Sequence, residues 1–175
     1  MRALFLDRDG VINKDYGHVH SKENFEFKEG IFELTESALA SGYSIFVITN
    51  QAGIAKGYYT EKEFQLFTQW IDKQFQAHNI KITKTYYCPH HPDYGNEQYR
   101  RICRCRKPGS ELFERAVTDF SIDMRKSIMI GDKLSDIEAA KDAGVGRLIL
   151  LDNDINVSND IYEVYKDLQE IRANI

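Results

Sequence analysis

Three aspartates directly follow short apolar runs of the sequence. Asp7 and Asp9 come after the run RALFL, and Asp132 comes after the run IMIG. On an extended segment, residues two apart can point the same way, so Asp7, Asp9 and nearby backbone carbonyls could form a hard oxygen site for Mg²⁺. Asp132 could supply a further ligand. Like charges this close raise one pKa unless a cation neutralises them. One carboxylate could then attack a substrate while the other carries a proton as general acid and base.

Groups suited to a phosphoryl anion end another apolar run and recur in a later loop. Thr49 and Asn50 close the run YSIFVITN and offer a hydroxyl, an amide and backbone N–H groups to phosphate oxygens. Lys107 could neutralise a phosphoryl group during its transfer. Asp, Asn and Gly are also ordinary turn residues, so each of these endings alone is as consistent with a turn as with a site. Their coincidence favours metal-assisted phosphate chemistry.

All three cysteines of the chain lie in one stretch without helix or strand periodicity. The pairs Cys88/His90 and Cys103/Cys105 supply four ligands whose number and chemistry suit a tetrahedral Zn²⁺. A filled shell of four ligands has no open position for water, so we expect a structural zinc. His91 is the alternative to His90. A redox centre is disfavoured because the stretch has no Cys-x-x-Cys pair.

The segments that must position these side chains alternate between strand and helix patterns. The longest helical pattern opens with the capping box Thr60…Glu63. Such alternation predicts an α/β fold, a parallel sheet flanked by helices on both faces, and these sheets bind ligands at the carboxyl ends of their strands. We expect one domain over residues 1–175, with a zinc-binding loop at about 88–109. The predicted strands are 2–6, 43–50, 82–88, 126–132 and 146–151, and the predicted helices are 30–41, 60–78, 110–120, 135–144 and a segment from about Asn159.

The charge balance and the N-terminus limit the class of partner. The chain has 23 Lys and Arg against 27 Asp and Glu, a formal charge of −4, which is a poor match to nucleic acid. The N-terminal apolar run is too short for a signal peptide, and no run approaches the ~20 residues that span a bilayer. We therefore expect a cytoplasmic protein without a membrane or nucleic-acid partner, and its small size suggests a monomer.

Four segments together resemble the motifs of the haloacid dehalogenase (HAD) superfamily, in the expected order. They are FLDRDGVIN, VITNQAG, CRKP and IMIGDKLSDIEAA. The segments DRDGVIN, TNQAGIAKG, CPHHP and CRCRKP are similar to the histidinol-phosphatase branch of that superfamily, and the single-domain layout resembles its heptose 1,7-bisphosphate phosphatases. The resemblance implies a Rossmann-like HAD fold, and the short spacing between the first two motifs leaves no room for a large cap domain.

The resemblance also implies roles for the residues at the matching positions. Asp7 would be the nucleophile that forms an aspartyl-phosphate, and Asp9 would be the general acid and base. Asp7, the carbonyl of Asp9 and Asp132 would hold a catalytic Mg²⁺. Thr49 and Lys107 would bind the transferring phosphoryl group. The zinc ligands would be Cys88, His90, Cys103 and Cys105.

Further residues are expected around the substrate. Arg106, beside the catalytic lysine, is the best candidate for a second phosphate or the sugar. Asp136 either orients the site or merely stabilises the first turn of its helix. His18 and His20 are interpreted as surface loop residues. Arg8 fits the family signature at the pocket, and the other substrate-binding candidates are Asn13, Thr49, Asn50, Gln51, Lys107 and Lys133.

These residues are most consistent with a Mg²⁺-dependent phosphatase acting on a small sugar bisphosphate. A histidinol-phosphate phosphatase shares nearly every motif and is the first alternative. A second is a nucleic-acid 3′-end phosphatase or binding module, because YRRICRCRK concentrates basic residues. A zinc-stabilised scaffold without activity would lack one of the catalytic residues, and none is missing.

Overall fold

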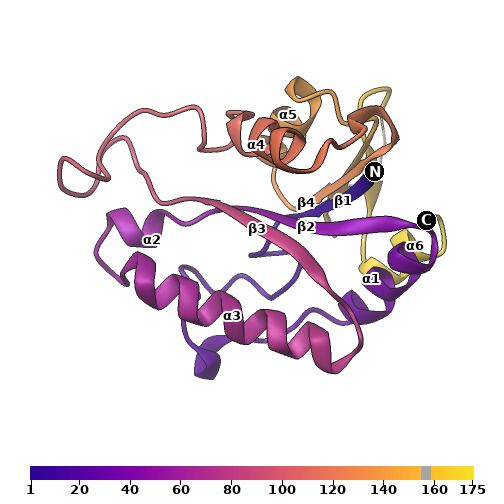
Figure 1. The fold of residues 1–175 in the computed structure, drawn as a ribbon, viewed down its shortest axis with the longest axis horizontal. Helices are drawn as coiled ribbons and strands as arrows, with labels where there is room; N and C mark the ends of the chain where they lie inside the picture. The colour runs from indigo at the N-terminus through magenta and orange to yellow at the C-terminus, as the bar shows by residue number, and fades with distance from the viewer. Residues whose placement is uncertain (155–158) are drawn as a thin grey trace.

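Six strands form one sheet within residues 1–154 and 159–175, which the computed structural model describes (Figure 1). Their order across the sheet is β3-β2-β1-β4-β5-β6, and all neighbouring strands run parallel. This arrangement confirms the predicted class of fold. The strands are β1 Arg2–Leu6, β2 Tyr43–Asn50, β3 Ile82–Cys88, β4 Ile128–Gly131, β5 Arg147–Leu151 and β6 Glu163–Tyr165.

Helices cover both faces of the sheet, as parallel pairing requires. In Figure 1, α1 and α3 lie below the sheet with α6, and α4 and α5 lie above it. The short helix α2 follows β2 directly, at the end of the sheet where the long loop after β3 extends. The helices are α1 Ile31–Ala40, α2 Ala52–Ala55, α3 Glu61–Ala77, α4 Glu111–Phe120, α5 Leu134–Asp142 and α6 Leu168–Arg172, with short 3₁₀ helices at Lys22–Asn24 and Met124–Lys126.

The core is divided by the sheet into two hydrophobic layers. In β1, Leu4 and Leu6 pack into the layer shared with α1, α3 and α6, whereas Ala3 and Phe5 pack into the layer shared with α4 and α5. All four side chains are fully buried. Burying one Leu or Phe side chain contributes about 1.5–3 kcal/mol, so β1 is anchored on both faces. This strand carries the first two aspartates out of the sheet at a well-defined position.

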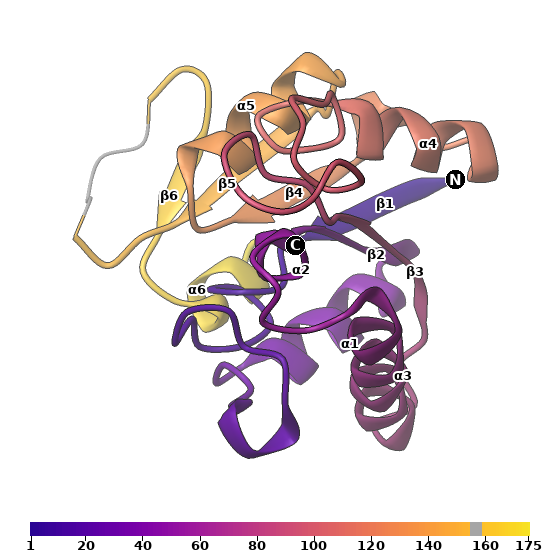
Figure 2. The same ribbon diagram turned by 90° about the vertical axis from the view of Figure 1, so that its left-hand side faces the viewer.

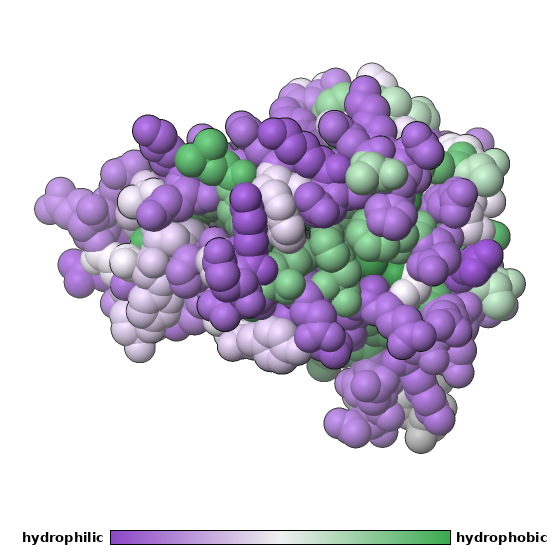
Figure 3. Space-filling view, turned by 90° about the horizontal axis from the view of Figure 1, so that it is seen from below, coloured by the Kyte–Doolittle hydropathy of each residue, from purple (hydrophilic) through white to green (hydrophobic). Residues whose placement is uncertain are grey.

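Helix α3 forms as the sequence predicts. Thr60 accepts a hydrogen bond from the backbone N–H of Glu63, and the Glu63 carboxylate accepts from the N–H of Thr60, which completes the capping box. One face is buried, and the side chains on it are Phe64, Phe67, Ile71 and Phe75. Figure 3 shows the molecule from below, where hydrophilic residues surround a central hydrophobic area.

The C-terminal segment differs from the predicted helix that would begin near Asn159. It forms the edge strand β6 first and only then the short helix α6. Glu163 lies in β6 and forms an ion pair with Arg147 of β5 at 2.7 Å, and Asp167 caps the start of α6. The segment YEVY is rich in residues that favour strands, and a free sheet edge beside β5 was available for it. The sheet therefore has one strand more than predicted.

The carboxyl ends of the strands face the viewer in Figure 2. The loop after β3 crosses this end on the side of α4 and α5, and the loop after β1 crosses it on the side of α1 and α3. Both loops and the end of β4 therefore meet at the carboxyl end of the sheet. No helix in the described part of the chain is long and apolar enough to cross a membrane.

Candidate active site

A cavity of about 600 Å³ lies at the carboxyl ends of the strands. Most of the residues that the sequence analysis selects for phosphate chemistry contribute to its wall. Thr49, Asn13 and Asp132 are exceptions and are not among its lining residues. The cavity is lined by Asp7, Asp9, Asp15, Gly17, His18, Asn50, Gln51, Ala52, Tyr59, Arg106, Lys107, Pro108, Lys133, Ser135 and Asp136.

Asp7, Asp132 and Asp136 bring carboxylate oxygens within 4.8 Å of one another. Asp7 follows β1, and the other two follow β4. Oδ1 of Asp132 is buried and has no hydrogen-bond partner. Gly10 leaves room for this group, because a Cβ at that position would lie 2.0 Å from Oδ2 of Asp132. Clustered acidic oxygens with an unsatisfied buried acceptor fit a hard divalent cation such as Mg²⁺.

Burial raises the pKa of Asp7 to about 8, although Lys107 acts in the opposite direction. The carboxylates of Asp136 and Asp132 also raise it. Burial is likewise the main reason why the pKa of Asp132 is raised. A divalent cation among these groups would favour their ionised forms, which is the form that a carboxylate nucleophile needs.

Lys107 is buried between two of the carboxylates. Its Nζ lies 2.9 Å from Oδ1 of Asp7 and 2.6 Å from Oδ1 of Asp136, and it donates to the carbonyl of Ile48 at 2.7 Å. Burial lowers the pKa of Lys107, but the two carboxylates outweigh burial and raise it above its usual value. The ammonium group is therefore charged at neutral pH and lies beside Oδ1 of Asp7.

Asn50 holds the backbone of Lys107 rather than pointing freely into the cavity. Its Oδ1 accepts from the N–H of Lys107 at 3.0 Å, and its Nδ2 donates to the carbonyl of Lys107 at 3.1 Å. From its sequence position, Asn50 is expected to contact substrate. In the structure its amide is used to place the lysine, so its role in the site is at least partly one of positioning.

The carboxylate of Asp9 points to a different set of partners from that of Asp7. Arg8 Nη2 lies 2.9 Å from both carboxylate oxygens, Asn13 Nδ2 donates at 3.0 Å, and Gln51 Nε2 donates at 3.1 Å. Asn13, a substrate-binding candidate from the sequence, is fully buried and is not among the residues that line the cavity. Thr49 is also buried, and its hydroxyl accepts from Gln51 at 2.9 Å.

Two further cations lie on the wall of the cavity. Arg106 is half-buried, and Nη1 is 3.5 Å from the carbonyl of His90. Lys133 is exposed and lies 3.2 Å from Asp15. Both line the cavity and have N–H groups free to contact an anion. Arg106 is the residue expected from the sequence to contact a second phosphate or the sugar, and Lys133 is a further substrate-binding candidate.

His18, Asp15 and Tyr59 line the cavity but were not predicted to belong to it. His18 and Asp15 lie in the loop after β1, and this position next to the first aspartate pair was the available signal. No sequence pattern pointed to Tyr59. His20 is not among the residues that line the cavity, and its ring stacks on the ring of Tyr59 with a centroid distance of 4.8 Å.

The predicted zinc ligands lie together beside this cavity. Cys88, His90, Cys103 and Cys105 form a mostly buried cluster, with Sγ–Sγ distances of 3.2, 3.3 and 3.6 Å. His90 Nδ1 lies 3.3 Å from Sγ of Cys105. These separations are close to the ~3.8 Å edge of a tetrahedron of thiolates around zinc. The donor set therefore fits Zn²⁺. His91 turns away, and its ring packs on Tyr94.

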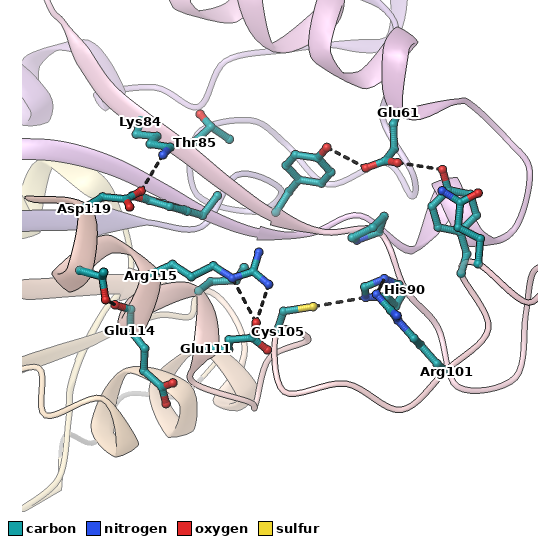
Figure 4. Close-up of a pocket in the computed structure, with 17 residues that line it drawn as sticks. Glu61, Lys84, Thr85, His90, Arg101, Cys105, Glu111, Glu114, Arg115 and Asp119 are labelled. Carbon is teal, nitrogen blue, oxygen red and sulfur yellow. Dashed lines mark hydrogen bonds and ion pairs between the residues drawn. The ribbon is translucent and has the colours of Figure 1, made fainter.

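A second cavity, of about 830 Å³, lies between β3, α4 and the zinc loop (Figure 4). Four of its charged side chains form two ion pairs. Lys84 lies 2.6 Å from Asp119, and Arg115 donates to Glu111. The first cavity is the candidate active site, because it holds the carboxylate cluster and the buried lysine.

Comparison with known proteins agrees with this assignment. A HAD-hydrolase-like family model matches residues 104–166. The D-glycero-beta-D-manno-heptose-1,7-bisphosphate 7-phosphatase of Vibrio cholerae is 47% identical over 149 residues, covering 85% of this chain and 80% of that protein. The D-glycero-alpha-D-manno-heptose-1,7-bisphosphate 7-phosphatase of Campylobacter jejuni is 45% identical over 170 residues, covering 97% of this chain and 93% of that protein. The chain belongs to the heptose-1,7-bisphosphate 7-phosphatase family of the HAD superfamily.

Solved structures of HAD phosphatases share this fold. A putative HAD-like phosphatase from Mesorhizobium loti has a TM-score of 0.88 at 25% identity, and covers 99% of this chain and 85% of that one. The D,D-heptose 1,7-bisphosphate phosphatase of B. bronchiseptica, complexed with magnesium and phosphate, has a TM-score of 0.84 at 22% identity over 99% of this chain and 97% of that one. The HAD-family chain is therefore a phosphoric monoester hydrolase, as the sequence predicts.

Proposed function

We propose that the chain is a Mg²⁺-dependent phosphatase that removes the C7 phosphate of D-glycero-D-manno-heptose 1,7-bisphosphate, in ADP-heptose and surface-polysaccharide biosynthesis. The observation that carries the proposal is the buried contact of Asp7 with Lys107 on the floor of the cavity. It occurs in a chain whose relatives at 43–47% identity are named for this reaction.

Asp7 is the nucleophile of the proposed reaction. Its carboxylate attacks the phosphorus of the C7 phosphate, the bond from phosphorus to the sugar oxygen breaks, and an aspartyl-phosphate forms. Asp9 gives a proton to the departing sugar oxygen and later takes one from the water that hydrolyses the aspartyl-phosphate. Lys107, 2.9 Å from Asp7, stabilises negative charge on the transferring group, and Thr49 donates its hydroxyl to it.

Mg²⁺ would be held by Asp7, the carbonyl of Asp9 and Asp132, and when bound it supplies charge neutralisation for the attacking carboxylate and the phosphoryl oxygens. Asp136, which the sequence left between two roles, is proposed to hold Lys107 through their 2.6 Å ion pair. It also accepts from the backbone N–H of Lys133 at 3.1 Å.

The substrate is proposed to occupy the cavity with its second phosphate or sugar near Arg106 and Lys133. A cavity of about 600 Å³ is within the usual range for small-molecule ligands, roughly 300–1,000 Å³. Gln51, which the sequence analysis selects for substrate binding, lies on the same wall. One chain supplies the described wall, and the enzyme is proposed to act as a monomer because of its small size.

Cys88, His90, Cys103 and Cys105 are proposed to hold a structural Zn²⁺. Cys105 lies two residues before Lys107, so the metal would fix the loop that delivers the lysine. The three cysteines are free thiols. A reducing compartment keeps thiols available to zinc, which supports a cytoplasmic enzyme.

The test is phosphate release from a panel of substrates. The panel contains both anomers of the heptose 1,7-bisphosphate, histidinol phosphate and a 3′-phosphorylated oligonucleotide. We expect kcat/KM to be highest for a heptose bisphosphate by at least 100-fold, and Asp7→Asn to abolish release while the far-UV circular dichroism is unchanged. Preference for histidinol phosphate or for the oligonucleotide would reject the proposed substrate, and full activity of Asp7→Asn would reject the mechanism.

A further inference from the structure

The side-chain amide of Gln51, on the wall of the cavity, contacts two groups of the proposed reaction. Its Nε2 donates to Oδ2 of Asp9 at 3.1 Å and to Oγ1 of Thr49 at 2.9 Å. Gln51 is almost completely buried. The amide presents its N–H₂ group to Oδ2 of Asp9, a carboxyl oxygen that accepts hydrogen bonds. Because the Thr49 oxygen accepts from Gln51, its own proton is free for a phosphoryl oxygen.

Tyr59 determines which way this amide faces. Its hydroxyl donates to Oε1 of Gln51 at 2.5 Å, which leaves Nε2 directed at Asp9 and Thr49. The hydroxyl stays protonated, because burial raises the pKa of Tyr59 to about 12.

The ring of Tyr59 is held from two sides. His20 stacks on it at 4.8 Å with an interplanar angle of 15°. On another side, Gly53 provides space for the ring, because a Cβ at that position would lie 2.2 Å from Cε1 of Tyr59. The tyrosine therefore has little freedom to move away from Gln51. A rigid donor is what a positioning residue needs.

We propose that Tyr59, acting through Gln51, is a positioning residue that aims the carboxyl group of Asp9 at the leaving-group oxygen. The inference rests on the proposed function, in which Asp9 is the general acid. In the first step Asp7 forms a bond to phosphorus and the bond from phosphorus to the leaving oxygen breaks. That oxygen keeps the bonding electrons and takes the proton of Asp9, which becomes a carboxylate.

The leaving group distinguishes this role from a general structural one. An alkoxide or phenolate of high pKa needs the proton of Asp9, whereas p-nitrophenolate leaves without it. If the carboxyl group of Asp9 is no longer oriented toward the leaving oxygen, phosphoryl transfer from the heptose bisphosphate and from phenyl phosphate should be slower. Transfer from p-nitrophenyl phosphate should change little. The parameter to compare is kcat/KM, which reports phosphoryl transfer to Asp7 and not the later hydrolysis.

The first experiment compares Tyr59→Phe with the wild type on these three substrates. Tyr59→Phe keeps the ring and removes only the hydroxyl. We expect kcat/KM to fall about 10-fold for the heptose bisphosphate and for phenyl phosphate, and less than 2-fold for p-nitrophenyl phosphate. Tyr86→Phe is the matched control, because Tyr86 is also buried and its hydroxyl bonds to Asp119 away from the active-site cavity. Equal losses on all substrates, or no loss, would overturn the proposal.

A double-mutant cycle tests whether Tyr59 acts through Gln51. Gln51→Leu should reproduce the dependence on the leaving group, and Tyr59→Phe should then cause no further change. Additive losses would reject the path through Gln51. If the wild type does not hydrolyse the heptose bisphosphate, the proposed substrate fails, but the pair of phenyl and p-nitrophenyl phosphates still decides the role of Tyr59.

Discussion

The side-chain amide of Asn50 brackets the backbone of Lys107, accepting from its N–H at 3.0 Å and donating to its carbonyl at 3.1 Å. The two residues come from β2 and from the loop after the zinc ligands. This contact holds the loop to the sheet at the residue that carries the proposed catalytic cation. Removing it should leave the lysine in the chain but out of place.

Asn50→Ala should therefore lower kcat by about 10–100-fold with a smaller change in KM. Misplacing a catalytic group by about 1 Å is enough for a loss of this size. Steady-state kinetics on the heptose bisphosphate measure it. Asn24→Ala, at an exposed asparagine, should leave kcat unchanged. Wild-type kcat in Asn50→Ala would mean that the two hydrogen bonds from Asn50 are not needed to place Lys107.

Lys107→Met should destabilise the protein by roughly 3 kcal/mol or more, because it leaves Asp7 and Asp136 buried without their cation. The free energy of unfolding in urea, measured at pH 7 without divalent metal, tests this. Lys84→Met is a matched control. Lys84 also lies 2.6 Å from an aspartate, Asp119, but both partners are well exposed, so its loss should cost about 0–1 kcal/mol. Similar losses in the two variants would contradict the importance of burial.

Gly10→Ala should weaken the response to Mg²⁺. Gly10 has φ of +92°, and a Cβ there would overlap the carboxylate of Asp132. We expect the Mg²⁺ concentration for half-maximal activity to rise at least about 10-fold, because Asp132 must move. Gly144→Ala is the control for backbone strain alone, since Gly144 has φ of +82° and open space around it. The same Mg²⁺ dependence in both variants would show that Asp132 tolerates the displacement.

Cys105→Ser should remove zinc from the protein and lower its activity together. Elemental analysis should give about one zinc per wild-type chain and much less in the variant, with a lower melting temperature. Because Cys105 lies two residues before Lys107, kcat should also fall. Wild-type zinc content in Cys105→Ser would reject the ligand assignment, and an unchanged kcat in a zinc-free variant would separate the zinc from the lysine.

Arg101→Ala should leave the zinc content unchanged although Arg101 touches a proposed ligand. Its Nη2 lies 2.7 Å from Nε2 of His90, while Nδ1 of His90 faces the cysteine sulfurs. When Nδ1 binds a metal, Nε2 of the neutral ring carries the proton and cannot accept from a guanidinium. The arginine is therefore not expected to support zinc binding. Loss of zinc in Arg101→Ala, measured by elemental analysis, would contradict this interpretation.

Local patterns predicted most of the fold because each depends on residues near one another in the chain. The apolar runs of β1 and β2, the capping box of α3 and the glycines that end helices are signals of this kind. The strand β6 was missed because its stability comes from pairing with β5, and the segment YEVY alone does not encode that partner.

The zinc ligands and the aspartates after β1 and β4 could be selected from residue type and spacing. Their neighbours could not. Their positions depend on the directions of side chains from separate segments. Examples are the hydrogen bonds of Asn50 to the backbone of Lys107, the contact of buried Asn13 with Asp9, and the place of Tyr59 on the cavity wall.

The sequence by itself determined the chemistry available to this protein: hard oxygen ligands at strand ends, one lysine in a cysteine-rich loop, and four soft ligands in two pairs. Only the tertiary structure decided how those groups are used. It joins Asp136 to Lys107 and connects Tyr59 to Asp9 through Gln51. The physical reason is that these side chains come from loops that follow different strands. Which loops meet at the carboxyl end of the sheet depends on the order of the strands, and that order is established only when the strands pack together.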